Sequence, residues 1–238
     1  MLNHAIVHDP ATRAPGQHAR SIVRRLRLRT LVALGVLAVA TALLGRTFGL
    51  RNITFIASEI GLLAAMFVVL RYVLPLVERH DRGATGEEQV GGLLDELGNG
   101  WHAIHDASLG NGNVDHILIG PAGVFTVETK SNPGPVRVAR VHGATLRQAQ
   151  AQRRAIERVT GMEVQPLLVY SCAWVDRPLA TRKGVKVLPA RMLAGYLDRH
   201  KPTLTSAQAA RARAQVTEAL REHRAREGRR SVGRRAAG

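Results

Sequence analysis

The chain has 238 residues, of which 34 are Lys or Arg and 18 are Asp or Glu, so its formal net charge is +16 and its pI is about 11.5. This charge favours a polyanionic partner, either nucleic acid or anionic lipid. The single cysteine excludes an intramolecular disulfide framework, and an aromatic content of 4% argues against a broad stacking platform for single-stranded nucleic acid.

The first 77 residues predict a membrane anchor. Residues 1–29 are polar and basic and are expected to be disordered. Two apolar runs follow, at about 30–45 and 52–77, and the second contains Glu59 and Arg71. Both runs lack a polar face, which predicts two membrane-spanning helices joined by a short loop. The arginines of the first segment are Arg20, Arg24, Arg25, Arg27 and Arg29.

The distribution of arginines predicts the orientation of this hairpin. More arginines precede the first run than lie between the runs, so the positive-inside rule places both termini and the rest of the chain in the cytoplasm. A cleaved signal peptide is one alternative, because residues 38–40 read AVA, but its basic segment would be unusually long. A soluble helical hairpin is another, but it would need apolar stripes.

Residues 83–200 have the pattern of a globular domain, and residues 201–238 that of a basic helical or disordered tail. The lone Cys172 falls in the apolar run PLLVYSCAW and is expected to be buried. The order of elements predicts an α/β fold with a mixed central sheet flanked by helices. The expected elements are a helix from Thr85, a hairpin at 114–130, a strand at 136–141, a helix at 145–159, strands at 164–175 and 184–189, and a helix at 190–200.

The hairpin VDHILIGPAGVFTVETK carries two carboxylates within its apolar pattern. If its loop is Gly120–Gly123, Asp115 falls opposite Glu128, and alternation places Lys130 on the same face. Directly opposed like charges are destabilising unless something relieves them, and a divalent cation would do so. The alternative is a register shifted by one residue, with both acids on a solvated face.

Glu87 is a third acid on an apolar face. It lies one turn before Val90, on the side of its helix that faces the core. It would either complement the dipole at the helix start or join Asp115, Glu128 and Lys130. Three acids and a lysine are the groups needed for phosphodiester hydrolysis, because carboxylates hold Mg²⁺ and the lysine stabilises developing charge.

Three stretches, GEEQVGGLLDEL, NVDHILIGPAGVFTVETK and the following GPV, resemble the NERD domain, a nuclease-related branch of the PD-(D/E)xK phosphodiesterase superfamily. The resemblance covers roughly residues 83–200 and implies a restriction-endonuclease-like fold. It implies that Asp115 and Glu128 bind Mg²⁺ or Mn²⁺ with the backbone carbonyl of Thr129. It also implies that Lys130 assists the attacking water and that Glu87 is the helix acid beside the site.

The resemblance leaves the glutamine of the next helix open. Members of the family usually have Asn-Pro before this glutamine, whereas this chain has Ala144 and Thr145 at those places. Gln148 is therefore the expected match, with Gln152 as its rival.

Two further groups of residues have weaker functional patterns. The spacing of His102, His105 and His116 follows no zinc pattern, so structural or surface roles are expected. Three arginines share one face of the helix at 145–159, which is either a solvated surface or a track for a phosphate backbone. They are Arg147, Arg154 and Arg158.

The sequence as a whole predicts a membrane-anchored, metal-dependent nuclease on the cytoplasmic side, acting on nucleic acid, with DNA favoured over RNA. The alternative is a non-catalytic module that holds nucleic acid or a protein at the membrane. A further possibility is that the basic termini bind anionic lipid.

Overall fold

The computed structural model describes residues 14–48, 53–98, 100–109 and 112–236. It contains two compact units: a helical unit, His18–Ala84, and a globular unit whose main part is Thr85–Gly238. The boundary between them falls within one helix, and each unit is described by itself.

The helical unit consists of α1 (Gln17–Phe48), α2 (Ile53–Val68), a five-residue π-helical segment (Val69–Val73) and the first part of α3 (Leu74–Asp95). Residues 17–29 are helical, whereas the sequence predicted disorder up to residue 29, so the arginine cluster belongs to α1. The rest of that prediction concerns residues 1–13, which lie outside the described residues. Arg27 forms an ion pair with Asp81.

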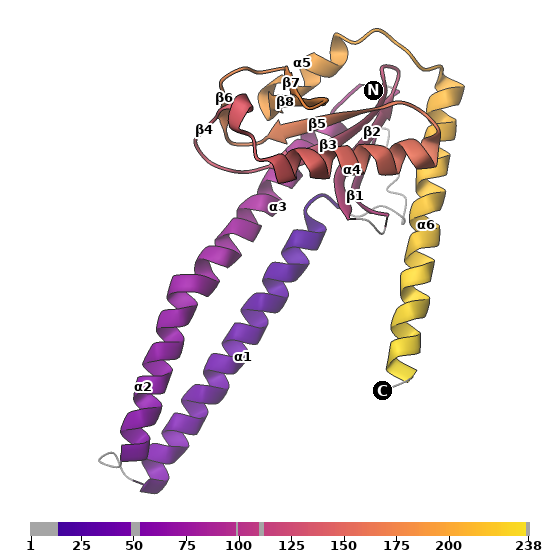
Figure 1. Cartoon of the computed structure of the whole chain (residues 1–238). Coiled ribbons are helices and arrows are strands. Elements are labelled where there is room, and N and C mark those ends of the chain that lie inside the picture. The colour runs from indigo at the N-terminus through magenta and orange to yellow at the C-terminus, as the bar shows by residue number, and fades with distance from the viewer. Residues whose placement is uncertain (1–13, 49–52, 99, 110–111, 237–238) are drawn as a thin grey trace, which may run out of the picture. The chain divides into compact units, whose positions relative to one another are not determined.

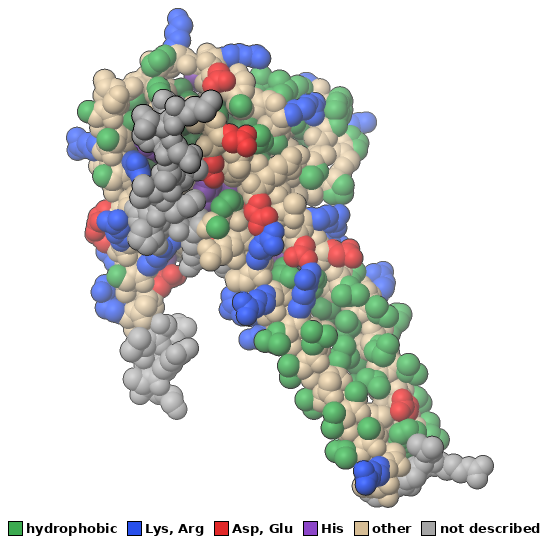
Figure 2. All heavy atoms as spheres, turned by 180° about the vertical axis from the view of Figure 1, so that it is seen from behind, with side chains coloured by type: hydrophobic (Ala, Val, Ile, Leu, Met, Phe, Trp, Pro, Cys, Tyr) green, Lys and Arg blue, Asp and Glu red, His purple; other side chains and the backbone are tan. Residues whose placement is uncertain are grey.

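Large apolar side chains cover the outside of α1 and α2 (Figure 2). Val36 on α1 and Leu63 on α2 are examples, with exposed fractions of 66% and 63%. The two helices pack tightly where Gly45 meets Phe55, because a Cβ on the glycine would lie 2.7 Å from the phenyl ring. Two helices, Ala19–Thr47 and Phe55–Asp95, are long and apolar enough to cross a membrane, by length and composition.

Helix α3 does not begin at Thr85, contrary to the prediction. It runs without a break from Leu74 to Asp95, so the capping residue expected at Thr85 lies inside the helix. The residues between the apolar run and Thr85 contain no proline, so nothing in them ends the helix. Glu87 therefore lies well beyond the first turn.

The globular unit is built on a mixed six-stranded sheet with the order β1-β2-β3-β5-β8-β7 (Figure 1). Strands β1 to β3 form an antiparallel meander, β5 and β8 run parallel to β3, and β7 returns antiparallel at the edge. The strands are β1 (His102–Ser108), β2 (Asn113–Gly120), β3 (Gly123–Lys130), β5 (Val164–Tyr170), β7 (Ala180–Arg182) and β8 (Val185–Pro189). A second, two-stranded sheet pairs β4 (Pro135–Val136) with β6 (Trp174–Val175).

Helices cover both faces of the main sheet. On one face, α3 and α5 (Leu193–Asp198) bury residues such as Val90 and Leu197 against Phe125. On the other face lie α4 (Gly143–Thr160) and α6 (Ser206–Ala236), which bury Ile156 and Val216. This arrangement confirms the predicted α/β class with a mixed sheet flanked by helices and preceded by two apolar helices.

The predicted register of the hairpin is confirmed. Ile119 pairs with Val124 and Ile117 pairs with Thr126, as the loop position required. The turn is tighter than the four-residue loop of the prediction, because its outer glycines pair with each other and only two residues remain between them. The acids of the two strands therefore keep the positions that the alternation predicted.

Three other predictions differ from the structure. The strand expected at 136–141 is only the short β4, followed by the 3-10 turn η2 (Val138–Arg140). Cys172 is exposed, because it follows β5 rather than lying inside it. The segment expected as a basic helical or disordered tail contains the helix α6 (Ser206–Ala236), and the difference from the prediction is that its buried Ala209, Ala212 and Leu220 belong to the core.

Candidate functional site

Asp115 and Glu128 lie where β2 and β3 separate. The last paired residues of these strands are His116 and Val127, and the next position in this register brings Asp115 opposite Glu128. Asp115 Oδ2 accepts a hydrogen bond from the backbone N–H of Thr129 at 2.7 Å. A side chain here replaces a strand-to-strand hydrogen bond, so the strands open around the two carboxylates.

Glu128 is the most enclosed acid of the site, with an exposed fraction of 1%. Its Oε1 accepts a hydrogen bond from Lys130 Nζ, and its Oε2 accepts one from Gln152 Nε2. Gln152 also donates to the backbone carbonyl of Asn113 at 2.8 Å. Helix α4 thus joins β2 to β3 through one buried amide.

The structure distinguishes the two glutamines of α4. Gln152 is buried and contacts Glu128, whereas the side chain of Gln148, one turn earlier, is exposed. Within the described residues, Gln148 makes no hydrogen bond to the acids. The structure therefore brings the rival glutamine, and not the expected one, into the cluster.

Glu87 reaches the site from α3 because its neighbour is a glycine. A Cβ on Gly86 would lie 1.8 Å from Ser131 Oγ and 2.6 Å from Ser171 Oγ, so only glycine lets α3 approach the ends of β3 and β5 this closely. The carboxylate of Glu87 accepts a hydrogen bond from the backbone N–H of Gly16.

Burial and mutual repulsion raise the pKa values of two of these acids. Burial, and then the charges of Asp106 and Glu128, raise the pKa of Glu87 from 4.5 to about 7. Burial, and then the charges of Glu128 and Glu87, hold the pKa of Asp115 well above its usual range, although the N–H of Thr129 opposes this. The site therefore contains more negative charge than its own partners neutralise.

Lys130 is the cation of the cluster. Burial acts to lower its pKa, but the adjacent Glu128, with Asp115 and Glu87, outweighs burial and raises the pKa above its usual value. The lysine therefore stays protonated at neutral pH and acts as a hydrogen-bond donor and positive charge, not as a base.

Asp106 is a member of the site that the sequence did not predict. It is buried on β1, its backbone has a φ of 50°, and Asn113 Nδ2 donates to its Oδ1. The strand register of β1 with β2 is interrupted at Asp106: His105 pairs with His116 and Ala107 pairs with Val114 on either side of it. An aspartate within the predicted globular domain was the sequence feature that could have indicated this residue. The irregular backbone at Asp106, which brings its charge near Glu87, depends on tertiary structure and could not be predicted from the sequence.

The acids fit a hard divalent cation. Within the described residues, no three His, Cys, Asp or Glu side chains are placed to hold a metal together. Mg²⁺ needs only one or two carboxylates, completed by carbonyl, water and phosphate oxygens. Asp115 and Glu128 supply these carboxylates. The N–H of Thr129 faces Asp115, and the carbonyl of a strand residue lies on the same edge as its N–H, so this carbonyl faces the acids too.

The predicted histidines are not part of this cluster. His105 and His116 are buried cross-strand neighbours whose Nδ1 atoms lie 2.8 Å apart, and His105 Nε2 lies 3.0 Å from Asp95 Oδ1. Burial, and then the neighbouring His105, hold the pKa of His116 well below its usual range. His102 is partly exposed on the same strand.

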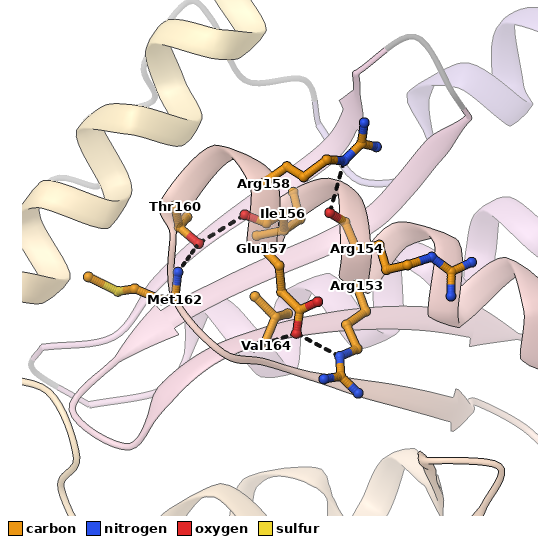
Figure 3. A network of polar contacts seen from close by, with 8 residues as sticks. All are labelled: Arg153, Arg154, Ile156, Glu157, Arg158, Thr160, Met162 and Val164. Carbon is orange, nitrogen blue, oxygen red and sulfur yellow. Dashed lines mark hydrogen bonds and ion pairs between the residues drawn. The ribbon is translucent and has the colours of Figure 1, made fainter.

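The C-terminal half of α4 carries a mixed-charge surface (Figure 3). Arg153 forms an ion pair of 2.7 Å with Glu157, which also accepts the backbone N–H of Val164 at 3.3 Å. Arg158 donates to the backbone carbonyl of Arg154 at 3.2 Å. With a carboxylate and carbonyl groups among its arginines, this face has the character of a solvated surface.

Comparison with solved structures found two distant similarities. A repair endonuclease from Pyrococcus abyssi is 15% identical, with 45% of this chain and 40% of that chain covered and a TM-score of 0.25. SfsA from Pyrococcus furiosus, in complex with Ca²⁺, is 17% identical, with 56% and 52% covered and a TM-score of 0.24. At these TM-scores neither structure carries a functional inference, and this chain spans about half or less of each.

No curated protein matches the chain. The sequence profile of the family described as "Nuclease-related domain" (NERD) matches residues 82–171. This segment contains α3 from Arg82, the hairpin with its acids, α4 and β5, and therefore every member of the cluster described above. Residues 82–171 of this chain thus match the nuclease-related domain (NERD) family in sequence.

Proposed function

We propose that the globular unit is a metal-dependent nuclease that hydrolyses phosphodiester bonds of nucleic acid. The observation that carries the proposal is the cluster at the separated ends of β2 and β3. There burial, together with the mutual repulsion of neighbouring acids, raises the pKa values of Glu87 and Asp115 next to Glu128 and the protonated Lys130. Such a cluster costs stability, and a role in binding and catalysis accounts for it.

The residues of the cluster have separate tasks. Asp115, Glu128 and the carbonyl of Thr129 would hold Mg²⁺ or Mn²⁺, which polarises a bound phosphate and lowers the pKa of bound water. Lys130 stabilises the negative charge that develops on the phosphate. Glu87, with a pKa of about 7, exchanges a proton with the attacking water or leaving group near neutral pH. Gln152 holds Glu128 in place.

Cleavage assays on the full chain in detergent micelles test this proposal. The full chain is required because α6 supplies core residues beyond the matched segment. Wild type should cleave DNA or RNA with Mg²⁺ or Mn²⁺ and not with a chelator, and Asp115→Asn should lose about a hundredfold or more in rate. The exposed Asp198 on α5 gives a matched control, because Asp198→Asn removes a carboxylate outside the cluster.

The assay has two outcomes that reject the proposal. Cleavage by Asp115→Asn at the wild-type rate would reject the assigned site. Salt-dependent binding of nucleic acid by wild type that needs no metal, survives loss of the acids and is never accompanied by cleavage would support a non-catalytic module instead.

We also propose that α1 and the segment from α2 to about residue 77 span a membrane, with the globular unit in the cytoplasm. Support comes from their exposed apolar surface and from the arginines of the first turns of α1. The only cysteine of the chain, Cys172, is exposed on the globular unit and reports its side of the membrane. A membrane-impermeant maleimide should label it in lysed cells only, and labelling in intact cells would reject this orientation.

A further inference from the structure

A cleft of about 590 Å³ opens directly beside Lys130. Its walls come from the segment after β3, the turn η2 and the first turn of α4, and the residues used below are Lys130, Arg137, Arg140, Thr145 and Tyr170. Lys130 also contacts Glu128, so the cleft adjoins the proposed metal site. A ligand in the cleft would therefore lie next to the phosphodiester bond that is cut. The inference about this ligand rests on the proposed function.

The cleft is cationic. Its lining includes Lys130, Arg137 and Arg140 and no acidic side chain. Both arginines are exposed, and within the described residues neither forms an ion pair or a side-chain hydrogen bond. The surface around Arg154 and Arg158 differs, because Glu157 lies among its lining residues. Of these two basic surfaces, the cleft is the one without a carboxylate among its cations, whereas on α4 Glu157 lies beside Arg154 and Arg158, and Arg158 already donates to a backbone carbonyl.

The two arginines are held on an anchored turn. Arg137 is the N-cap of η2 and Arg140 is its last residue, and the N–H of Arg140 donates to the carbonyl of Arg137 at 2.8 Å, so one closed turn places both arginines at the cleft. The buried Val138 between them is fixed twice: its N–H donates to Asp176 Oδ1 at 2.9 Å, and its carbonyl accepts from Arg182 Nη1 at 2.8 Å. A fixed backbone reduces the entropy that a ligand must overcome when it orders these side chains.

The size and polar groups of the cleft indicate its ligand. Tyr170, which is otherwise buried in the core, and Thr145 also line the cleft, so two hydroxyl-bearing side chains lie beside the three cations. Cations and hydroxyls together suit phosphate oxygens. The volume is that of a site for a single small ligand, such as one nucleotide.

We propose that this cleft binds the sugar–phosphate backbone of an unpaired strand next to the scissile phosphate, so that the domain acts on nucleic acid where a strand is single. Arg137 and Arg140 contact the phosphate that neighbours the cleaved one. A strand in a duplex is held against its complement and cannot enter the cleft without local unpairing. The low aromatic content agrees with this mode, because the cleft uses phosphate contacts instead of a series of stacked bases.

Fluorescence anisotropy with the full chain in detergent micelles, in the presence of a chelator, tests this proposal. The probes are labelled single-stranded DNA and RNA and a blunt DNA duplex of the same sequence. Arg137→Ala/Arg140→Ala is compared with Arg191→Ala/Arg199→Ala, which removes the same charge from exposed arginines outside the cleft. Comparison of single-stranded DNA with single-stranded RNA shows which of these two sugar–phosphate backbones the cleft prefers.

Wild type should bind single strands at least about tenfold more tightly than the duplex, and the cleft variant should lose about tenfold or more. Each neutralised phosphate of a single strand contributes about 0.7 to the slope of log K against log salt, so the cleft variant, which loses its contacts to one phosphate, should lower this slope by about 0.7 and the control should not. Equal binding by the two double variants, or equal binding of duplex and single strand, would overturn the proposal. Competition by a free nucleoside monophosphate at the same concentration as the strand would overturn it too.

The outcomes separate this inference from the proposed function. Asp115→Asn in the chelator should bind single strands at least as tightly as wild type does, because the cleft does not use that carboxylate and loses a nearby negative charge. Binding through the arginines without any cleavage by wild type in Mg²⁺ or Mn²⁺ would refute the proposed function and leave the cleft assignment standing. Cleavage that depends on Asp115 but not on Arg137 or Arg140 would support the proposed function and refute the cleft assignment.

Discussion

Replacing Glu87 with glutamine should make the stability of the globular unit less sensitive to pH. Glutamine keeps the shape of the side chain and an oxygen that can accept the N–H of Gly16, but it cannot ionise. In wild type, the pKa of Glu87 rises from 4.5 to about 7 on folding because the site is buried and already negative. The carboxyl group is therefore protonated at low pH in both states, and at high pH the folded state bears the cost of ionising it.

The sign and size of the effect follow from this shift. A group whose pKa is raised on folding contributes stability that is fully present below its unfolded pKa and is lost as pH rises through its folded pKa. The full shift corresponds to about 3 kcal/mol, and screening of the partly exposed side chain reduces this to about 1–2 kcal/mol. Between pH 5 and pH 8, the stability of Glu87→Gln relative to wild type should therefore increase by about 1–2 kcal/mol.

Urea denaturation of the full chain in micelles measures this difference. Both tryptophans lie in the globular unit, and Trp101 packs near Phe125 with ring centroids 6.0 Å apart, so fluorescence reports unfolding of this core. Glu96→Gln, which changes an exposed acid just after α3, is the matched control and should show no such pH dependence. If the stability difference between Glu87→Gln and wild type is the same at pH 5 and pH 8, the inferred electrostatics of the site are wrong.

Three further substitutions test how the site is held. Gly86→Ala should lower the free energy of unfolding by about 1–3 kcal/mol, because the added methyl group would overpack against two serine side chains. The control Gly92→Ala, which has nothing within 4 Å, should be neutral or stabilising. Equal effects of the two substitutions in urea denaturation would contradict the close approach of α3. Gln152→Ala should cost about 1–3 kcal/mol because it leaves a buried carboxylate oxygen without its donor, and Gln148→Ala should stay within about 0.5 kcal/mol. Val216→Ala should lower the free energy of unfolding by about 2 kcal/mol, because Val216 is fully buried. An unchanged melting temperature would mean that α6 does not contribute to the core.

The hairpin could be predicted because its determinants are local. Turn residues fix the position of the loop, alternation fixes the face of each side chain, and a shift by one residue would have exposed the apolar face. The pairing of Ile117 with Thr126 follows from these rules, and so does the opposition of Asp115 and Glu128. The central part of the site was therefore contained in seventeen consecutive residues, Val114 to Lys130.

The rest of the site depends on how separate elements pack. The choice between Gln148 and Gln152 depends on how α4 is rotated about its axis over the sheet. The sequence does not determine this rotation, because α4 carries polar residues on several faces. The cleft arginines lie on a turn that the sequence presented as part of a strand, because its apolar and basic residues alternate. The helical spacing of Ala209, Ala212 and Val216 is that of a buried face on α6. The many arginines around these residues favoured the prediction of a solvated tail instead.

The continuity of α3 decides between the two interpretations of Glu87. A carboxylate at a helix start is favoured by the exposed N–H groups of the first turn, and this effect does not extend beyond that turn. Because α3 begins at Leu74, Glu87 receives no such benefit, and its burial beside other acids raises its pKa to about 7 at a net cost to stability. The neighbouring Gly86, a poor helix former, keeps it there by allowing the close approach of the helix. Two consecutive residues that each disfavour the folded helix, and that together place a carboxyl group of raised pKa near Asp115 and Glu128, are not explained by stability and favour the proposed catalytic role.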